Sequence, residues 1–187
     1  MSILKDIRRQ QQIRAAEGYL DLVMVCADRW PLRAETRDRI AKRALQSLSE
    51  VVADEYQSGH VHYLHGQALR VMEKYGDAVH PLRMALEMEP EDIHIHLALG
   101  WCYKRVDRLD LAIQSLEEAM DVMPEKGIIH YNLACYWSLA NNAQLAVQYL
   151  AQSFELDPNY RDMVATETDF DPIRDDPQFR QMTSVIV

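Results

Sequence analysis

Three of the seven histidines in this 187-residue chain lie close together, at His60, His62 and His65. His62 and His65 are three positions apart, the spacing that places two side chains on one face of a helix. Imidazole nitrogens commonly bind zinc, and Cys102 and Cys135 could add metal ligands or act as nucleophiles. The first question is therefore whether these residues predict a metal site and an enzyme.

The elements that would position these residues follow an internal repeat. The segments ALEMEP, AMDVMP and SFELDP end at Pro90, Pro124 and Pro158, which are 34 residues apart. A register kept in so many columns is not expected by chance, and it indicates repeated structural units. The other columns with this spacing are Gly66, Gly100 and Ala134; Ala78, Ala112 and Ala146; Leu82, Leu116 and Leu150; and Ala85, Ala119 and Ser153.

Each unit has the pattern of two amphipathic helices. The segments IHIHLALGWCYKRV and LDLAIQSLEEAMDVM carry apolar residues at helical spacing, and Asp107 and Arg108 mark the turn between them. Small residues recur where two helices must approach closely, and the closing proline ends each unit because it cannot continue a helix. We expect about eight long helices in antiparallel pairs and no sheet.

These columns resemble the tetratricopeptide repeat, abbreviated TPR, a family with the same 34-residue period. Residues 128–158, IIHYNLACYWSLANNAQLAVQYLAQSFELDP, are similar to the family pattern throughout, with Ala134 in place of glycine. The resemblance implies three repeats (59–92, 93–126 and 127–158) in an all-α, right-handed α-solenoid. One departure is Pro81, which is expected either to bend its helix or to delay its start.

The two ends of the chain fit the repeat less well. Residues 1–58 are predicted to form a divergent TPR-like helical pair, with helices at about 5–28 and 34–55, because Ala44, Leu48 and Val51 keep the register of the second helix. Residues 159–187, interrupted by two prolines, are predicted to form a helical cap. Such a cap would cover the apolar end of the last helix pair.

The composition limits the classes of function. A formal net charge of −9 argues against a nucleic-acid binder. Three cysteines without a CxxC pair predict a reducing compartment, and with no visible signal peptide we expect a cytoplasmic protein. The most apolar stretch, YLDLVMVCA, contains Asp21 and is far shorter than the roughly 20 residues of a membrane span.

The repeat also argues against a metal site. His62, His96 and His130 occupy one column, and successive helices pack roughly 8–10 Å apart, whereas each ligand nitrogen must lie about 2 Å from a zinc ion. His62 and His65 remain the plausible pair, although His65 shares its column with leucines. The cysteines fit small apolar positions, and no phosphate loop or ordered catalytic triad is visible. We expect no catalytic residue, no metal and no cofactor.

A binding surface remains. In the family that this chain resembles, the first helix of each pair lines a concave groove for peptides or partner helices. An alternative is that some of the lining residues pack under the N-terminal helices or the cap. A clamp for the carboxyl terminus of heat-shock chaperones is not expected, because no cation stands at the matching positions Tyr63, Gln67, Ala98, Ile128 and Asn132. The lining predicted from the matching columns is His60, Tyr63, Gln67 and Arg70; His94, Leu97, Trp101, Lys104 and Arg105; and Ile128, Tyr131, Cys135 and Ser138.

The sequence therefore predicts a non-catalytic protein–protein interaction module, acting as an adaptor, scaffold or assembly factor. Because Arg70, Lys104 and Arg105 are in the predicted lining and no carboxylate is, the partner is expected to combine acidic and apolar anchors. One alternative is a self-assembling scaffold whose N-terminal helices dock in the groove of another copy. Another is a metal-dependent or cysteine-dependent enzyme on a helical scaffold.

Overall fold

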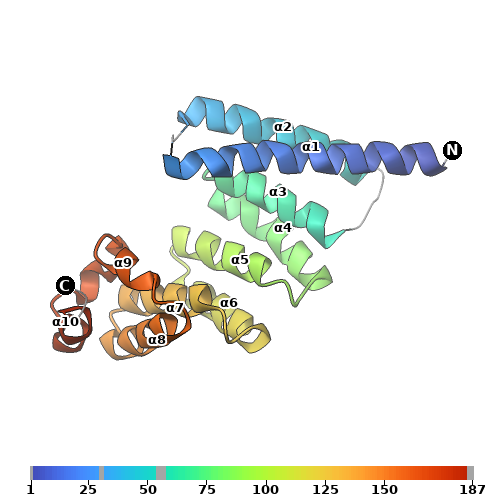
Figure 1. Ribbon diagram of the computed structural model, residues 1–187. Helices are drawn as coiled ribbons and strands as arrows, with labels where there is room; N and C mark the ends of the chain where they lie inside the picture. Colours follow the sequence, from blue (N-terminus) through green and yellow to red (C-terminus); the bar gives the residue numbers. More distant parts are fainter. Residues whose placement is uncertain (1, 30–31, 54–57, 185–187) are drawn as a thin grey trace. The chain divides into compact units, whose positions relative to one another are not determined.

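The computed structural model describes residues 2–29, 32–53 and 58–184, and these ranges contain helices and turns but no strand (Figure 1). The eight long helices predicted from the sequence are present, and the all-α helical-repeat fold is confirmed. They are α1 (Ser2–Arg29), α2 (Ala34–Ala53), α3 (Gly59–Val71), α4 (Tyr75–Met88), α5 (Ile93–Arg105), α6 (Leu109–Val122), α7 (Gly127–Leu139) and α8 (Ala143–Leu156). Three short helices follow, α9 (Tyr160–Val164), the 3₁₀ helix η1 (Thr168–Ile173) and α10 (Pro177–Thr183).

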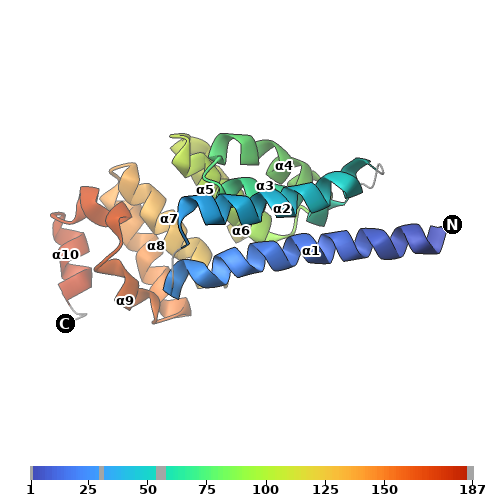
Figure 2. The same cartoon turned by 90° about the horizontal axis from the view of Figure 1, so that it is seen from above.

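The N-terminal pair agrees with the prediction to within a few residues. The first helix is longer at both ends than the predicted 5–28, and α2 begins at the predicted residue. The last two residues of the predicted 34–55 helix lie outside the described ranges. In the projections of Figures 1 and 2, α1 runs beside α2 and extends past it at the N-terminal end.

The chain divides into two compact units, Met1–Cys102 and Tyr103–Val187, with the boundary inside α5. In the first unit, helices α1, α2 and α3 share a core. Ala44, Leu48 and Val51, which the repeat register selected from the divergent N-terminal pair, are all buried in that core. The predicted domain boundaries at residues 58 and 158 stay a prediction.

The small columns are buried as the repeat predicts. Ala78, Ala112 and Ala146 have no exposed surface. In the first unit, a β-carbon added to Gly66 of α3 would lie 2.5 Å from Cγ of Leu82 in α4. Glycine is therefore needed here for the close approach of α3 and α4, whose packing explains the small residues of this column.

The turn inside each repeat is a Schellman motif, in which a residue with positive φ ends the first helix. Glu73, Asp107 and Asn141 have φ angles of 61°, 59° and 57°, and they are again 34 residues apart. The backbone N–H of the next residue donates to the carbonyl five positions earlier, at 2.9 Å in all three turns: Lys74 to Leu69, Arg108 to Tyr103, and Asn142 to Trp137. The turn predicted at residues 107–108 is confirmed.

Pro81 lies inside α4, which already begins at Tyr75. The alternative that this proline delays the helix is therefore wrong. Its side chain is buried, next to fully buried Leu82. A buried ring that lacks an N–H donor removes one intrahelical hydrogen bond but adds apolar contact, and the helix continues through it.

Candidate functional site

The histidine column connects consecutive repeats. The Nε2 atom of His96 lies 3.0 Å from the carbonyl oxygen of Pro90, and that of His130 lies 2.6 Å from the carbonyl oxygen of Pro124. Because a carbonyl oxygen can only accept, each Nε2 atom carries the hydrogen and donates it. These histidines therefore satisfy a carbonyl at the end of the preceding repeat, a role that the shared spacing of the His and Pro columns could have indicated.

The histidines at 60–65 were considered as metal ligands. In the part of the chain that is described, no group of three His, Cys, Asp or Glu side chains is placed to hold a metal ion. Burial lowers the pKa of His65, and the nearby His62 and His80 lower it further. His65 is consequently a partly buried, neutral imidazole at pH 7.

The cysteines are poorly suited to nucleophilic chemistry. All three are free thiols, and Cys102 and Cys135 are buried. Burial raises the pKa of Cys102 to about 11, although Arg70 opposes the shift. Burial also raises the pKa of Cys135, and the carboxylates of Glu167 and Asp169 add to that effect. Both thiols remain protonated near neutral pH, while the thiolate is the reactive form.

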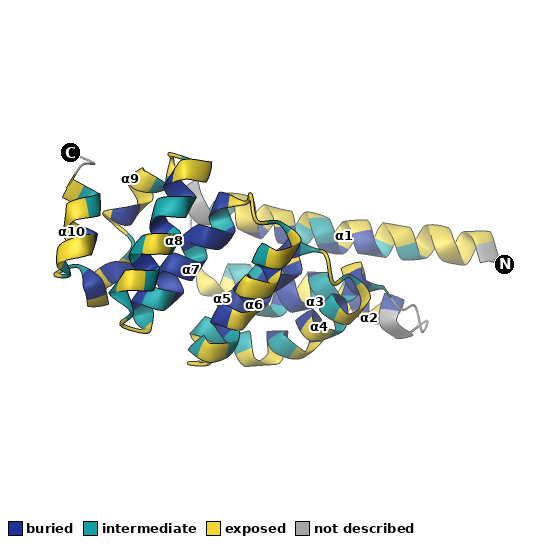
Figure 3. Ribbon diagram, turned by 90° about the horizontal axis from the view of Figure 1, so that it is seen from below, coloured by how far each residue is buried: buried dark blue, intermediate teal, exposed yellow. Residues whose placement is uncertain are grey.

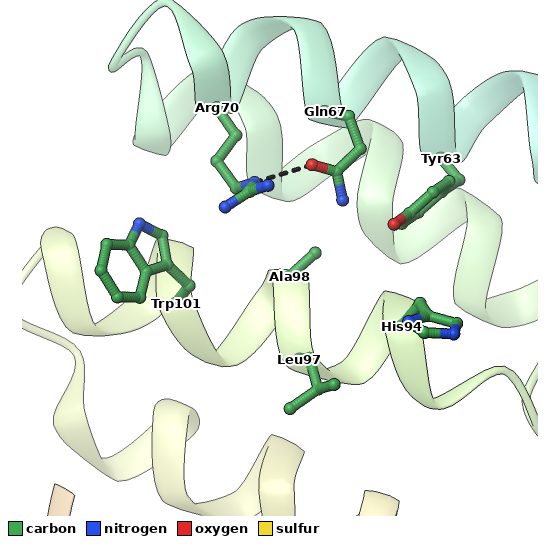
Figure 4. A pocket seen from close by; sticks show the side chains of 7 residues that line it. All are labelled: Tyr63, Gln67, Arg70, His94, Leu97, Ala98 and Trp101. Carbon is green, nitrogen blue, oxygen red and sulfur yellow. Dashed lines mark hydrogen bonds between the residues drawn. The ribbon is translucent and has the colours of Figure 1, made fainter. Parts of the chain in front are cut away.

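Six of the thirteen residues predicted to line the groove, together with Ala98, surround a pocket in the first unit, between α3 and α5 (Figure 4). Its volume is about 210 Å³. Six of its seven lining residues were predicted, and Ala98, taken from the sequence only as a chaperone-clamp position, is the seventh. The lining residues are Tyr63, Gln67, Arg70, His94, Leu97, Ala98 and Trp101.

The two walls of this pocket differ in chemistry. From α3, the Nε atom of Arg70 donates to Oε1 of Gln67 at 2.7 Å, which orients the guanidinium group (Figure 4). Burial raises the pKa of Tyr63, an effect that Arg70 opposes, so the phenol stays protonated. From α5, Leu97 and Trp101 supply apolar surface, and Trp101 is 39% exposed. The pocket thus offers one cation beside apolar side chains.

The remaining predicted lining residues lie elsewhere. Arg105 is exposed on the last turn of α5 and is not a lining residue of the pocket. Tyr131 and Ser138, on α7, are buried. Lys104 is mostly buried, and its Nζ atom lies 2.5 Å from Oδ2 of Asp169 in the C-terminal segment. The prediction that Arg70, Lys104 and Arg105 form a cationic strip with no carboxylate nearby is therefore wrong for Lys104. The repeat columns could not show that Asp169 lies beside it.

Among the residues described here, none of the helices combines the length and apolar character needed to span a bilayer.

Comparison with known proteins agrees with the geometry of the repeats. Residues 93–126 match the family profile described as tetratricopeptide repeat. A crystal structure of MamA is similar with a TM-score of 0.60 and 21% identity, over 80% of this chain and 89% of that chain. A crystal structure of YrrB, a TPR protein with an unusual peptide-binding site, has a TM-score of 0.61 and 17% identity, over 85% of this chain and 84% of that chain. No curated protein sequence matches the chain. Residues 93–126 are thus a tetratricopeptide repeat, and the chain shares the helical-repeat fold of these solved structures.

Proposed function

We propose that this protein is a non-catalytic interaction module that binds an extended peptide or a partner helix in the pocket between α3 and α5. The TPR fold itself is a repeat scaffold for protein interaction. YrrB has an unusual peptide-binding site on a similar fold, and a site of the same general kind suits the pocket here. The expected cytoplasmic location stays a prediction.

The observation that carries the proposal is the composition of the pocket. Arg70 is the only cation among its seven lining residues, and none of these residues is a carboxylate. An acidic side chain of a partner would be attracted to Arg70, while an apolar side chain would pack on Trp101 and Leu97. A short segment that combines Asp or Glu with a large apolar residue fits this pair of walls.

The experiment compares partner capture by four variants of the tagged full-length chain in native lysate, quantified by mass spectrometry. Trp101→Ala removes the apolar anchor and Arg70→Glu reverses the charge. Met88→Ala and Arg83→Glu, both at exposed positions on α4, make similar changes outside the pocket. The proposal predicts that a specific partner is lost from the first two variants and retained by the second two.

Titration of the purified partner then measures affinity. Losing a central aromatic anchor commonly costs about 2 kcal/mol or more, so Trp101→Ala should weaken binding by more than tenfold. Equal affinity of the partner for the Trp101→Ala and Met88→Ala variants would show that the pocket is not the binding site.

Self-assembly is the second candidate, favoured by a separate observation on α1. Ile3, Leu4 and Ile7 are exposed near the N-terminal end of this helix, where much of the ribbon has the exposed colour (Figure 3). Ile3 and Ile7 line a surface hollow of about 400 Å³. Light scattering over a concentration series tests it. A mass that rises with concentration and returns to the monomer value in the Ile3→Glu, Ile7→Glu variant would favour self-assembly over a monomeric adaptor.

A further inference from the structure

The C-terminal segment, defined here as residues 160–184, packs on α7 as well as on α8 of the second unit. The ring of Tyr131 in α7 stacks on Tyr160 with centroids 5.0 Å apart. The same ring meets the edge of Phe170 at 5.9 Å. Phe170 is fully buried and also contacts Phe179 at 5.4 Å. The segment therefore packs on both helices of the last pair, whose apolar end it was predicted to cover.

The repeat register identifies the face of α7 that the segment covers. Tyr131 is in the same column as Tyr63 and Leu97, which line the pocket of the first unit. Lys104, which pairs with Asp169, is in the same column as Arg70. The segment thus packs against residues whose equivalents in the first unit line an open pocket.

The occupant has the chemistry that was predicted for a partner. Asp169 places a carboxylate on the ammonium group of Lys104, and the next residue, Phe170, places an aromatic ring on Tyr131. Residues 160–184 contain six carboxylates and three arginines, which gives a net charge of −3. An acidic residue followed directly by an aromatic one is therefore a combination that this face accommodates.

Two buried hydroxyl groups of α7 are unsatisfied. The hydroxyl groups of Tyr131 and Ser138 are buried and have no hydrogen-bond partner among the described residues. A buried hydroxyl without a partner is unfavourable relative to one that contacts water or a ligand. A partner segment that offers a hydrogen-bond acceptor to the Tyr131 hydroxyl would form a hydrogen bond that the C-terminal segment does not form.

We propose that residues 160–184 are a displaceable intramolecular ligand of α7, and that a partner protein exchanges with them through a segment in which Asp or Glu directly precedes an aromatic residue. The exchange is independent of the pocket between α3 and α5. It makes the face of α7 an interaction surface that the chain itself occludes until a competing segment is present.

The test uses a fluorescent peptide with the sequence of residues 165–176, ATETDFDPIRDD, and the full-length chain. In the chain, Asp169→Lys breaks the contact with Lys104 and repels it, while leaving every residue of α7 unchanged. Asp175→Lys is the matched control, because the side chain of Asp175 is 93% exposed and pairs with Arg180 within the segment. Fluorescence anisotropy then measures the affinity of each chain for the peptide.

The proposal predicts that the Asp169→Lys chain binds the peptide at least tenfold more tightly than the wild-type and Asp175→Lys chains do. A peptide carrying Phe170→Ala should bind the Asp169→Lys chain at least tenfold more weakly than the original peptide. Equal affinity of all three chains for the original peptide would overturn the proposal.

Hydrogen exchange on the wild-type chain decides the matter if the Asp169→Lys chain does not fold. Excess peptide should speed backbone exchange in residues 160–184 and leave the protection of α3 and α4 in the first unit unchanged. An unchanged exchange rate in residues 160–184 at the highest peptide concentration would overturn the proposal. Because Trp101 and Arg70 are untouched in both experiments, this result is separable from the test of the proposed function.

Discussion

Lys104 and Asp169 form an ion pair of 2.5 Å between residues that are 65 positions apart in the sequence. Their side chains are only 14% and 16% exposed, so the pair is largely withdrawn from water. It connects the end of α5 to η1, and the ammonium group of Lys104 also lies 5.5 Å from the ring centre of Tyr136. This pair anchors the C-terminal segment to the end of α5 within the second unit.

Removing one charge of this pair should destabilise the protein. Asp169→Asn removes the carboxylate charge beside the mostly buried ammonium group of Lys104, and we expect the free energy of unfolding to fall by about 1–3 kcal/mol. Urea unfolding followed by circular dichroism measures the change. The exposed pair between Arg108 and Asp110 provides the control, since Arg108→Gln should leave the unfolding midpoint unchanged. Similar midpoints for both variants would show that the buried pair contributes no more than the exposed one.

Glycine substitutions should have opposite effects at two helical positions. In Gly66→Leu the new side chain collides with Leu82, and overpacking of this kind costs about 1–3 kcal/mol. In Gly18→Ala, on the exposed face of α1, no heavy atom lies within 4 Å of the new β-carbon. Alanine there should stabilise the helix by up to about 1 kcal/mol. Thermal melting that shifts in the same direction for both variants would contradict the packing described for α3 and α4.

The fold was predictable from the sequence because repetition supplies many independent observations of one structural unit. The columns of small residues, leucines and prolines predicted the helix pairs, and the turns at Glu73, Asp107 and Asn141 repeat with the same period. The pocket was predictable for the same reason. Two pairs of its lining residues, Tyr63 with Leu97 and Gln67 with Trp101, come from equivalent positions on α3 and α5, so the register of one helix also gave that of the other.

The arrangement of the C-terminal segment was not predictable in this way. Residues after Pro158 have no counterpart in the repeat columns, so nothing in the register placed Asp169 beside Lys104 or Phe170 beside Tyr131. The segment TDFDPI does carry a signal, an aromatic residue between carboxylates. That signal indicates a buried anchor, but the sequence alone does not name the surface on which it packs.

The purified chain should contain no stoichiometric zinc or iron. His96 and His130 use their Nε2 atoms as donors to proline carbonyls, and Cys102 and Cys135 are buried thiols with raised pKa values. Elemental analysis of protein purified without chelator measures the metal content, and melting with and without EDTA tests whether any metal stabilises the fold. One zinc per chain together with an EDTA-sensitive melting temperature would revive a metal site at His62 and His65.

Stability should decrease with falling pH because of His65. Its folded-state pKa is lowered from the ordinary value of 6.5 by burial, His62 and His80, so the unfolded chain takes up its proton first as the pH falls. The free energy of unfolding should therefore fall as the pH decreases through 6.5 toward the folded pKa, and level off below that pKa. His65→Leu, which introduces the residue found at Leu99 and Leu133, should remove this part of the slope between pH 7.5 and 5.5. The exposed His94→Gln provides the control, and urea unfolding at several pH values compares the slopes. If His65→Leu and His94→Gln retain the same pH dependence as the wild type, His65 is not responsible for it.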